Sequence, residues 1–133
     1  MRKRTPRPKP LRVLIADDDR LFAEALEAIL AADERIEVVG QASDGSEAVQ
    51  LARSLRPDLV LMDVSMPVLD GFEATREIRE ESEHTRVLML TGSNSRADVD
   101  RSREAGASGY VTKDRIASEL VATIVEVTQR RLP

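Results

Sequence analysis

Met62-Asp-Val-Ser-Met-Pro-Val-Leu-Asp-Gly71 is the stretch that decides the fold. It continues an apolar run over residues 59–62, ends that run with the carboxylate of Asp63, and turns at once at Pro67. A run of about four to eight apolar residues bounded by turn signals is typical of a strand buried on both faces. An acidic side chain at the carboxyl end of such a strand lies where open α/β sheets bind their ligands. Asp63 is therefore predicted to be a functional aspartate rather than a solvated one.

Similar apolar runs recur along the chain and alternate with segments of helical periodicity. Strands are predicted at residues 11–16, 36–40, 59–62, 86–91 and 109–112. Helices are predicted from Asp19, as N-cap, through residues 22–30, from Asp44 or Ser46 to before Pro57, and over about 69–80, 96–105 and 115–129. Strict alternation with short connections implies right-handed crossovers and a parallel sheet covered on both faces. The predicted fold class is thus α/β, a doubly wound five-stranded parallel sheet with five helices.

The last two helices differ in how well they should be anchored. Residues 96–105 contain only Ala97, Val99 and Ala105 as apolar residues, a stripe too sparse to hold a helix firmly. Residues 115–129 have a broad apolar surface. The helix over 96–105 is therefore predicted to be the weakly attached one.

Composition narrows the class of protein. At 133 residues with 41% hydrophobic residues, the chain is expected to form one globular domain, over residues 11–133. No apolar run approaches the roughly 18 residues of a membrane span, so no membrane contact is expected. The absence of cysteine excludes disulfides and thiolate metal sites and favours a cytoplasmic location. One His and no Trp leave little material for a zinc site or a base-stacking platform.

The first ten residues have a different character from the rest. They hold five of the 20 Lys and Arg residues, no acidic residue, and three prolines. A disordered basic tail is predicted there, solvated or touching nucleic acid or an acidic partner. The remaining residues, 15 basic against 24 acidic, should repel nucleic acid, so no direct nucleic-acid binding by the domain is expected.

Chemically useful side chains follow four of the predicted strands. Asp17 and Asp18 follow the first, Asp63 the third, Thr91 the fourth and Lys113 the fifth. The carboxyl ends of parallel strands share one edge of the sheet, so these side chains should meet in one pocket. Three carboxylates there would repel one another and raise one another's pKa values. Oxygen ligands without thiolate or imidazole suit a hard cation, and Mg²⁺ in particular.

Four motifs now stand in a recognisable order. They are Leu11-Arg-Val-Leu-Ile-Ala-Asp-Asp-Asp-Arg-Leu-Phe22, Asp63-Val-Ser-Met-Pro-Val-Leu-Asp-Gly71, Val87-Leu-Met-Leu-Thr-Gly92 and Gly109-Tyr-Val-Thr-Lys-Asp114. Together they resemble the receiver domain of two-component response regulators, over about residues 11–130. The resemblance implies a flavodoxin-like, CheY-like fold and a role in phosphorelay signal transduction.

Site roles follow from that resemblance residue by residue. Asp63 would be the phosphoacceptor, taking a phosphoryl group from a sensor histidine kinase or a phosphotransfer protein. Asp18 and Asp63 would bind Mg²⁺ directly, with the backbone carbonyl of Ser65, while Asp17 would act through water. Lys113 would pair with the carboxylate and then with the phosphoryl oxygens. The protein would be no enzyme in the usual sense, because it would catalyse only its own phosphorylation and dephosphorylation.

The switch is likewise an implication of the resemblance. Thr91 would turn its hydroxyl toward the new phosphate and Tyr110 would follow inward, although Tyr110 could also be a merely packed strand aromatic. Repacking of residues 94–105 would then change a surface for a downstream protein or a self-dimer. That surface would comprise the helix over 96–105, the strand over 109–112 and the last helix, and would include Arg96, Arg101 and Arg103.

Two features bear on which kind of receiver this is. Leu21 and Phe22 lie where the family places Leu-Phe if Asp17 and Asp18 are the acidic pair, which makes Asp19 a helix cap rather than a ligand. The Lys-Asp sequence ending at Asp114 is similar to receivers linked to LuxR-type transcription factors. The alternative function is therefore the receiver part of a DNA-binding regulator whose helix-turn-helix is not in this chain. A metal-dependent phosphatase is disfavoured because Ser65 stands where such enzymes carry a second aspartate, and ATP binding is not expected without a Gly-rich loop.

Overall fold

The computed structural model describes residues 9–92 and 95–129. Most of the predicted disordered tail, and residues 130–133 of the predicted domain, lie outside that part of the chain. Lys9 and Pro10, the two tail residues that are described, are exposed. None of the described helices combines the length and the apolar character that crossing a membrane requires.

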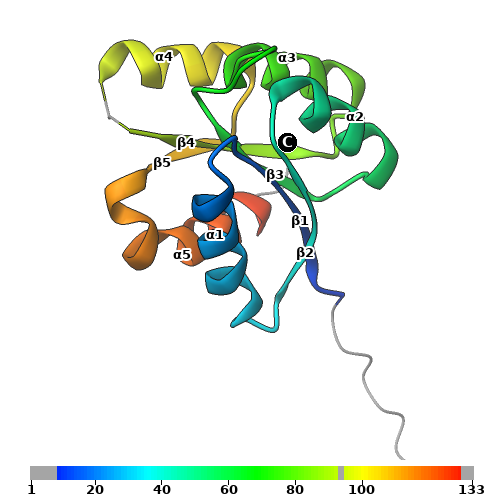
Figure 1. Cartoon of the computed structure of the whole chain (residues 1–133), viewed down its shortest axis with the longest axis vertical. Coiled ribbons are helices and arrows are strands. Elements are labelled where there is room, and N and C mark those ends of the chain that lie inside the picture. The colour runs from blue at the N-terminus through cyan, green and yellow to red at the C-terminus, as the bar shows by residue number, and fades with distance from the viewer. Residues whose placement is uncertain (1–8, 93–94, 130–133) are drawn as a thin grey trace, which may run out of the picture.

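The described chain forms a five-stranded parallel sheet between two layers of helices (Figure 1). The strands are β1 (Leu11–Ala16), β2 (Ile36–Ala42), β3 (Leu59–Asp63), β4 (Arg86–Thr91) and β5 (Gly109–Thr112). The helices are α1 (Arg20–Ala31), α2 (Gly45–Leu55), α3 (Gly71–Glu81), α4 (Arg96–Ala105), the short 3-10 turn η1 (Lys113–Arg115) and α5 (Ile116–Gln129). The strand order β2-β1-β3-β4-β5 confirms the predicted doubly wound fold.

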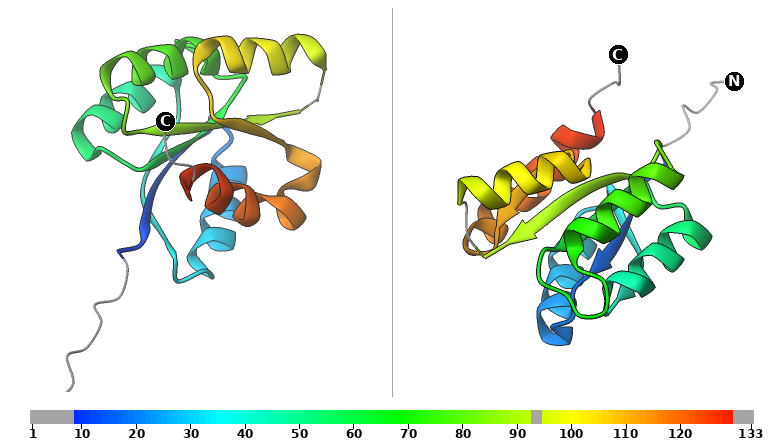
Figure 2. Two further views of the ribbon diagram at one scale, coloured as in Figure 1. Left: turned by 180° about the vertical axis from the view of Figure 1, so that it is seen from behind. Right: turned by 90° about the horizontal axis from the view of Figure 1, so that it is seen from above.

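The two helical layers bury opposite faces of the sheet. Helices α1 and α5 cover one face, and α2, α3 and α4 lie side by side over the other (Figures 1 and 2). Successive residues of a strand point to opposite faces. Accordingly Val13 and Ile15 of β1 pack in the core under α1 and α5, while Leu14 and Ala16 pack under α2 and α3. This double burial explains why the inner strands β3 and β4 are nearly continuous apolar runs.

Aspartate caps set where the helices begin. The side chains of Asp19, Asp44 and Asp70 each accept a hydrogen bond from the backbone N–H three residues on, at 3.2, 2.8 and 2.9 Å. Such a bond satisfies one of the free N–H groups of the first helical turn. Asp19 is confirmed as a cap, and of the two predicted caps for α2 it is Asp44 that serves. Helix α3 begins at Gly71, two residues after the predicted start, because Asp70 is its cap.

Several predicted details differ from the structure. Strand β2 continues to Ala42, because its last residues pair in register with the end of β1. Ile29, an apolar residue of the helix predicted through residues 22–30, is exposed. Helix α5 starts one residue later than predicted, after η1.

Helix α4 is as weakly anchored as its sequence predicts. Only Ser102 and Ala105 of this helix are buried. The Arg101 guanidinium adds a contact to α3, since its central carbon lies 4.0 Å from the centre of the Phe72 ring. Little apolar surface therefore holds α4 in place.

Gly71 lets α3 approach the end of β3 closely. A Cβ atom at this position would lie 2.1 Å from the backbone carbonyl oxygen of Asp63, a distance that no packed structure tolerates. The Gly71 N–H donates to the Val64 carbonyl at 3.1 Å, and its own carbonyl accepts from the Thr75 hydroxyl at 2.7 Å. Because Gly71 has no side chain, the start of α3 can pack directly against the backbone of Asp63.

Replacing Gly71 by Ala should lower the free energy of unfolding by about 2 kcal/mol or more, because the added methyl group must displace the backbone of Asp63. Urea unfolding checks this, with Gly92→Ala as the matched control. No described atom lies within 4 Å of a Cβ built at Gly92. Equal stability of the two variants would contradict the close packing at Gly71.

Candidate functional site

The carboxyl ends of the strands bring three carboxylates together. Asp17 and Asp18 follow β1, and Asp63 is the last residue of β3, the neighbour of β1 in the sheet. One carboxylate oxygen from each of the three lies within 4.8 Å of the others. The predicted meeting of these side chains at one edge of the sheet is confirmed.

Lys113 lies against two of these carboxylates. Its Nζ atom is 3.4 Å from Asp17 Oδ2 and 3.4 Å from Asp63 Oδ1. It comes from η1, directly after β5, at the other side of the crevice. The residues that line the crevice are Asp18, Asp19, Asp63, Val64, Ser65, Thr91, Gly92, Asp98 and Lys113.

The two members of the acidic pair occupy different environments. Asp17 is buried, and its Oδ1 atom accepts a hydrogen bond from the Asp19 N–H at 2.8 Å while its other oxygen faces Lys113. Asp18 is exposed at the mouth of the crevice. Asp19 is not among the three clustered carboxylates. Assigning 17 and 18 as the pair therefore agrees with the geometry.

The crevice carries an electrostatic strain. Burial raises the pKa of Asp63 to about 6, the Asp17 carboxylate adds to the rise, and Lys113 and the Ser65 N–H offset only part of it. Burial also raises the pKa of Asp17, against the Asp19 N–H and Lys113. Burial opposes the charged form of Lys113, but Asp63 and Asp17 together outweigh it and raise the Lys113 pKa. One ammonium group does not balance this much negative charge.

The donor set fits a hard cation. The clustered atoms are carboxylate oxygens, and no cysteine or histidine lines the crevice within the described chain. Oxygen-only sites of this kind suit Mg²⁺, Ca²⁺ or Mn²⁺ rather than zinc or copper. The acidic triad is therefore capable of binding a metal ion.

The two residues predicted to form the switch lie apart. Thr91, the last residue of β4, is buried and lines the crevice. Tyr110, in the middle of β5, is 39% exposed and lines a separate small cavity with Val99 and Arg103 of α4. Tyr110 is thus on the outside in this structure, next to α4.

Two residues at the site were not predicted from the sequence. From the sequence, Phe22 served only to identify the acidic pair and had no predicted role at the site, but its ring centre lies 4.5 Å from Lys113 Nζ. Helix phase could have indicated this, since Phe22 is one turn after Asp18. Asp98 belongs to a helix rich in polar residues, so nothing in the pattern indicated a role at the site. It reaches the crevice because Ser95 caps α4 and thereby places Asp98 in the first turn.

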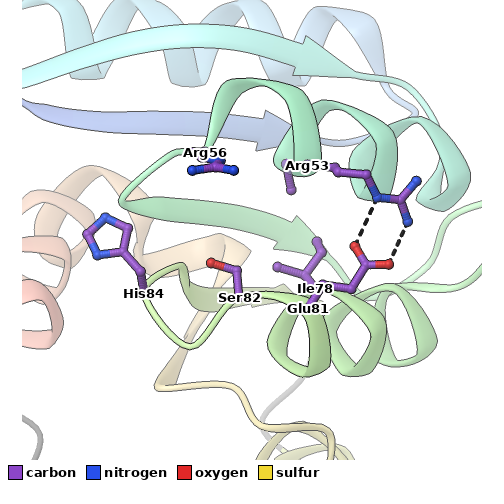
Figure 3. A pocket seen from close by; sticks show the side chains of 7 residues that line it. Arg53, Arg56, Ile78, Glu81, Ser82 and His84 are labelled. Atoms are coloured by element: carbon purple, nitrogen blue, oxygen red, sulfur yellow. Dashed lines mark hydrogen bonds and ion pairs between the residues drawn. The ribbon is translucent and has the colours of Figure 1, made fainter.

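A second cavity lies away from the carboxylates, between α2 and α3 (Figure 3). Arg53 and Glu81 form a two-bonded ion pair across it, at 3.1 and 2.5 Å. His84, at its edge, pairs with Asp58 at 3.0 Å. Among the described residues, this cavity holds no cluster of carboxylates, whereas the crevice brings three of them together beside Lys113, so the crevice is the candidate site.

Replacing Asp63 by Asn should stabilise the metal-free protein by about 1–3 kcal/mol near neutral pH, because it removes a buried negative charge. The folded pKa of about 6 lies above the ordinary value of 3.8, so folding disfavours the ionised form. The resulting loss of wild-type stability is absent below about pH 4, grows between about pH 4 and 6, and reaches its full value above about pH 6. Asp63→Asn removes this loss, so its stabilising effect should follow the same pH dependence.

Urea unfolding of both proteins in chelator, from about pH 4 to 7.5, measures the difference. Asp100→Asn, which alters an exposed carboxylate of α4, is the control. A stability difference that stayed constant over this pH range would contradict the raised pKa.

Comparison with known proteins agrees with this geometry. The sequence model of the response regulator receiver domain matches residues 13–125. The chain is 36% identical over 119 residues to the transcriptional regulatory protein DegU of Brevibacillus brevis, an alignment covering 90% of this chain and 50% of DegU. It thus spans about half the length of that curated relative.

Solved structures agree as well. The receiver domain of the response regulator NarL from Mycobacterium tuberculosis superposes with a TM-score of 0.88 at 32% identity, covering 93% of this chain and all of that one. A CheX–CheY–BeF3–Mg²⁺ complex from Borrelia burgdorferi superposes with a TM-score of 0.85 at 26% identity, covering 92% of both chains. With the strand order, the acidic triad and Lys113 in place, these matches show that the chain belongs to the response regulator receiver domain family.

Proposed function

We propose that Asp63 accepts a phosphoryl group from a phosphohistidine of a sensor histidine kinase or phosphotransfer protein, in a reaction that requires Mg²⁺. The observation that carries the proposal is the cluster of three carboxylates within 4.8 Å, with Lys113 3.4 Å from two of them. Asp63 is 4% exposed and lines this open crevice, through which a donor can reach it.

Asp18 and Asp63 would hold Mg²⁺ directly, with the Ser65 backbone carbonyl, and Asp17 would act through water. The chemistry of the donor set supports this, and so does the Mg²⁺ named for the CheY complex. When bound, Mg²⁺ neutralises the carboxylates and the charge on the transferring group. It would also lower the Asp63 pKa and so favour the nucleophilic carboxylate.

The chain's own residues would do the rest. An Asp63 carboxylate oxygen forms a bond to phosphorus while the phosphorus–nitrogen bond of the donor breaks, and the imidazole leaves with the electron pair. Lys113, already beside Asp63, offers its ammonium to the phosphoryl oxygens. Catalysis of phosphoryl transfer consists mostly of such positioning and charge neutralisation.

Incubation with acetyl phosphate and Mg²⁺ should add one phosphoryl group to the wild type and none to Asp63→Asn, as seen by intact-mass spectrometry. Asp100→Asn is the matched control and should be phosphorylated like the wild type. Omitting Mg²⁺ should prevent the gain in mass. A phosphoryl group that persists in Asp63→Asn would overturn the assignment of the phosphoacceptor.

We further propose that phosphorylation is transmitted through Thr91 and Tyr110 to α4. Thr91 lines the crevice, Tyr110 stands beside α4, and α4 has little apolar surface to hold it. A new dianion can shift such an element between two arrangements. The changed surface, over α4, β5 and α5, would meet a downstream protein or a second copy. Arg96, Arg101 and Arg103 are all exposed there, and Arg101 also stacks on Phe72.

The inward movement of Tyr110 is directly measurable, because the chain has one Tyr and no Trp. Beryllofluoride with Mg²⁺ should reduce acrylamide quenching of the tyrosine fluorescence, since Tyr110 would leave solvent. Thr91→Ala should abolish the change in quenching, because it removes the hydroxyl that would contact the phosphoryl group. Thr91→Ser keeps that hydroxyl and should retain the change. Unchanged quenching in the wild type would exclude the movement.

A second candidate is the receiver part of a DNA-binding transcriptional regulator. It is favoured by the relatives, which are named as transcriptional regulators and are about twice as long as the matched region.

In either case we propose residues 11–133 as the receiver, residues 1–10 as a disordered basic tail, and a cytoplasmic location, which the absence of cysteine favours. Reading the gene beyond codon 133 for a helix-turn-helix separates the two candidates.

A further inference from the structure

We propose that Phe22 is a positioning residue for Lys113: its aromatic ring holds the ammonium group at the crevice through a cation–π contact. The inference rests on the proposed phosphoryl transfer to Asp63. It concerns a side chain of α1 that neither binds metal nor touches the transferred group.

The two ion pairs leave Lys113 loosely held. Each joins its Nζ atom to a carboxylate oxygen at 3.4 Å, whereas charge-assisted hydrogen bonds of this type are about 2.7–2.9 Å long. A lysine ammonium sits on a flexible four-carbon stem and is strongly attracted to water. The Lys113 side chain is 32% exposed, so solvent competes for it. Asp17 and Asp63 alone therefore do not confine the amine.

Phe22 supplies the third contact. The Lys113 Nζ atom lies over the ring, 4.5 Å from its centre, within the roughly 6 Å over which the ring face attracts a cation. A neutral ring suits this place better than another carboxylate would. It attracts the ammonium without competing with the phosphoryl oxygens as an anion, and without adding to the repulsion in the crevice.

The acidic run itself fixes the position of the ring. Asp17 Oδ1 accepts from the Asp19 N–H at 2.8 Å, and Asp19 Oδ1 accepts from the Phe22 N–H at 3.2 Å. The ring also packs against the buried core beneath α1 and α5. Phe22 is thus held by the same backbone segment as the acidic pair. The ring that contacts the ammonium group therefore keeps a fixed position relative to the carboxylates.

A purely structural role for Phe22, as core packing, must be distinguished from this one. Mono-, di- and trifluorinated phenylalanine at position 22 withdraw charge from the ring face stepwise and leave its shape nearly unchanged. We expect the rate of phosphorylation by acetyl phosphate, at saturating Mg²⁺, to fall with each step. The most fluorinated ring and Phe22→Leu should both be about threefold to tenfold slower than wild type. Phe22→Tyr should restore the rate to near that of wild type.

The chain offers a matched control in its other phenylalanine. Phe72 also carries a cation on its ring, Arg101, but lies on α3 away from Lys113. The same analogues at position 72 should leave the rate unchanged. The contact has a readout independent of activity: the NMR shifts of the Lys113 Cε protons, which the ring current displaces, should move toward unperturbed values in Phe22→Leu.

The possible outcomes distinguish a failure of the proposed role of Phe22 from a failure of the proposed phosphorylation of Asp63. A rate that stays constant across the fluorinated series at position 22, with Asp63 still phosphorylated, would overturn the role of Phe22 and leave the phosphoacceptor untouched. Equal losses at positions 22 and 72 would also overturn it, since they would reflect packing alone. Absence of phosphorylation in the wild type, with the Lys113 shifts still dependent on Phe22, would contradict the proposed function instead.

Discussion

Crowding of like charge at the end of β1 and β3 is the constraint from which the rest of the site follows. Asp17, Asp18 and Asp63 place carboxylate oxygens within 4.8 Å of one another, and two of them are buried. Burial and mutual repulsion together favour the neutral form of Asp63, as its raised pKa shows. Such an arrangement costs stability unless positive charge enters it. Lys113 supplies part of that charge, and a hard cation would supply the remainder. The same excess of negative charge makes the crevice receptive to a metal cation.

The scaffold around the carboxylates is correspondingly rigid on one side and loose on the other. Beneath Asp63, a fully buried strand and the close approach of Gly71 leave its backbone no freedom. Beside Thr91, by contrast, α4 is attached through two buried side chains and the Arg101–Phe72 stack. In the proposed switch, α4 is therefore the element with the least apolar contact to oppose a movement. This asymmetry agrees with the proposal that phosphorylation of Asp63 changes the surface over α4.

Aspartate serves two different purposes within a few residues here, and the backbone decides which. Asp19 caps α1, while its neighbours Asp17 and Asp18 join the carboxylate cluster. The cap and the cluster are joined, because Asp17 accepts the N–H of Asp19. Phe22, positioned by that cap, then reaches the ammonium of Lys113. The short segment over residues 17–22 thus positions the acidic pair, the start of α1 and the aromatic contact to Lys113.

The amino-acid order by itself determined the alternation of strands and helices, the identity of the acidic groups and the weakness of α4. These depend on periodicity, capping and burial, which are local properties that a linear pattern carries. Only the tertiary structure decided that Ile29 faces solvent, that Gly71 lies against the Asp63 carbonyl, and that Phe22 and Asp98 reach the crevice. Each of these depends on distances between segments remote in sequence, and such distances are set by how helices pack on the sheet, which no local pattern records.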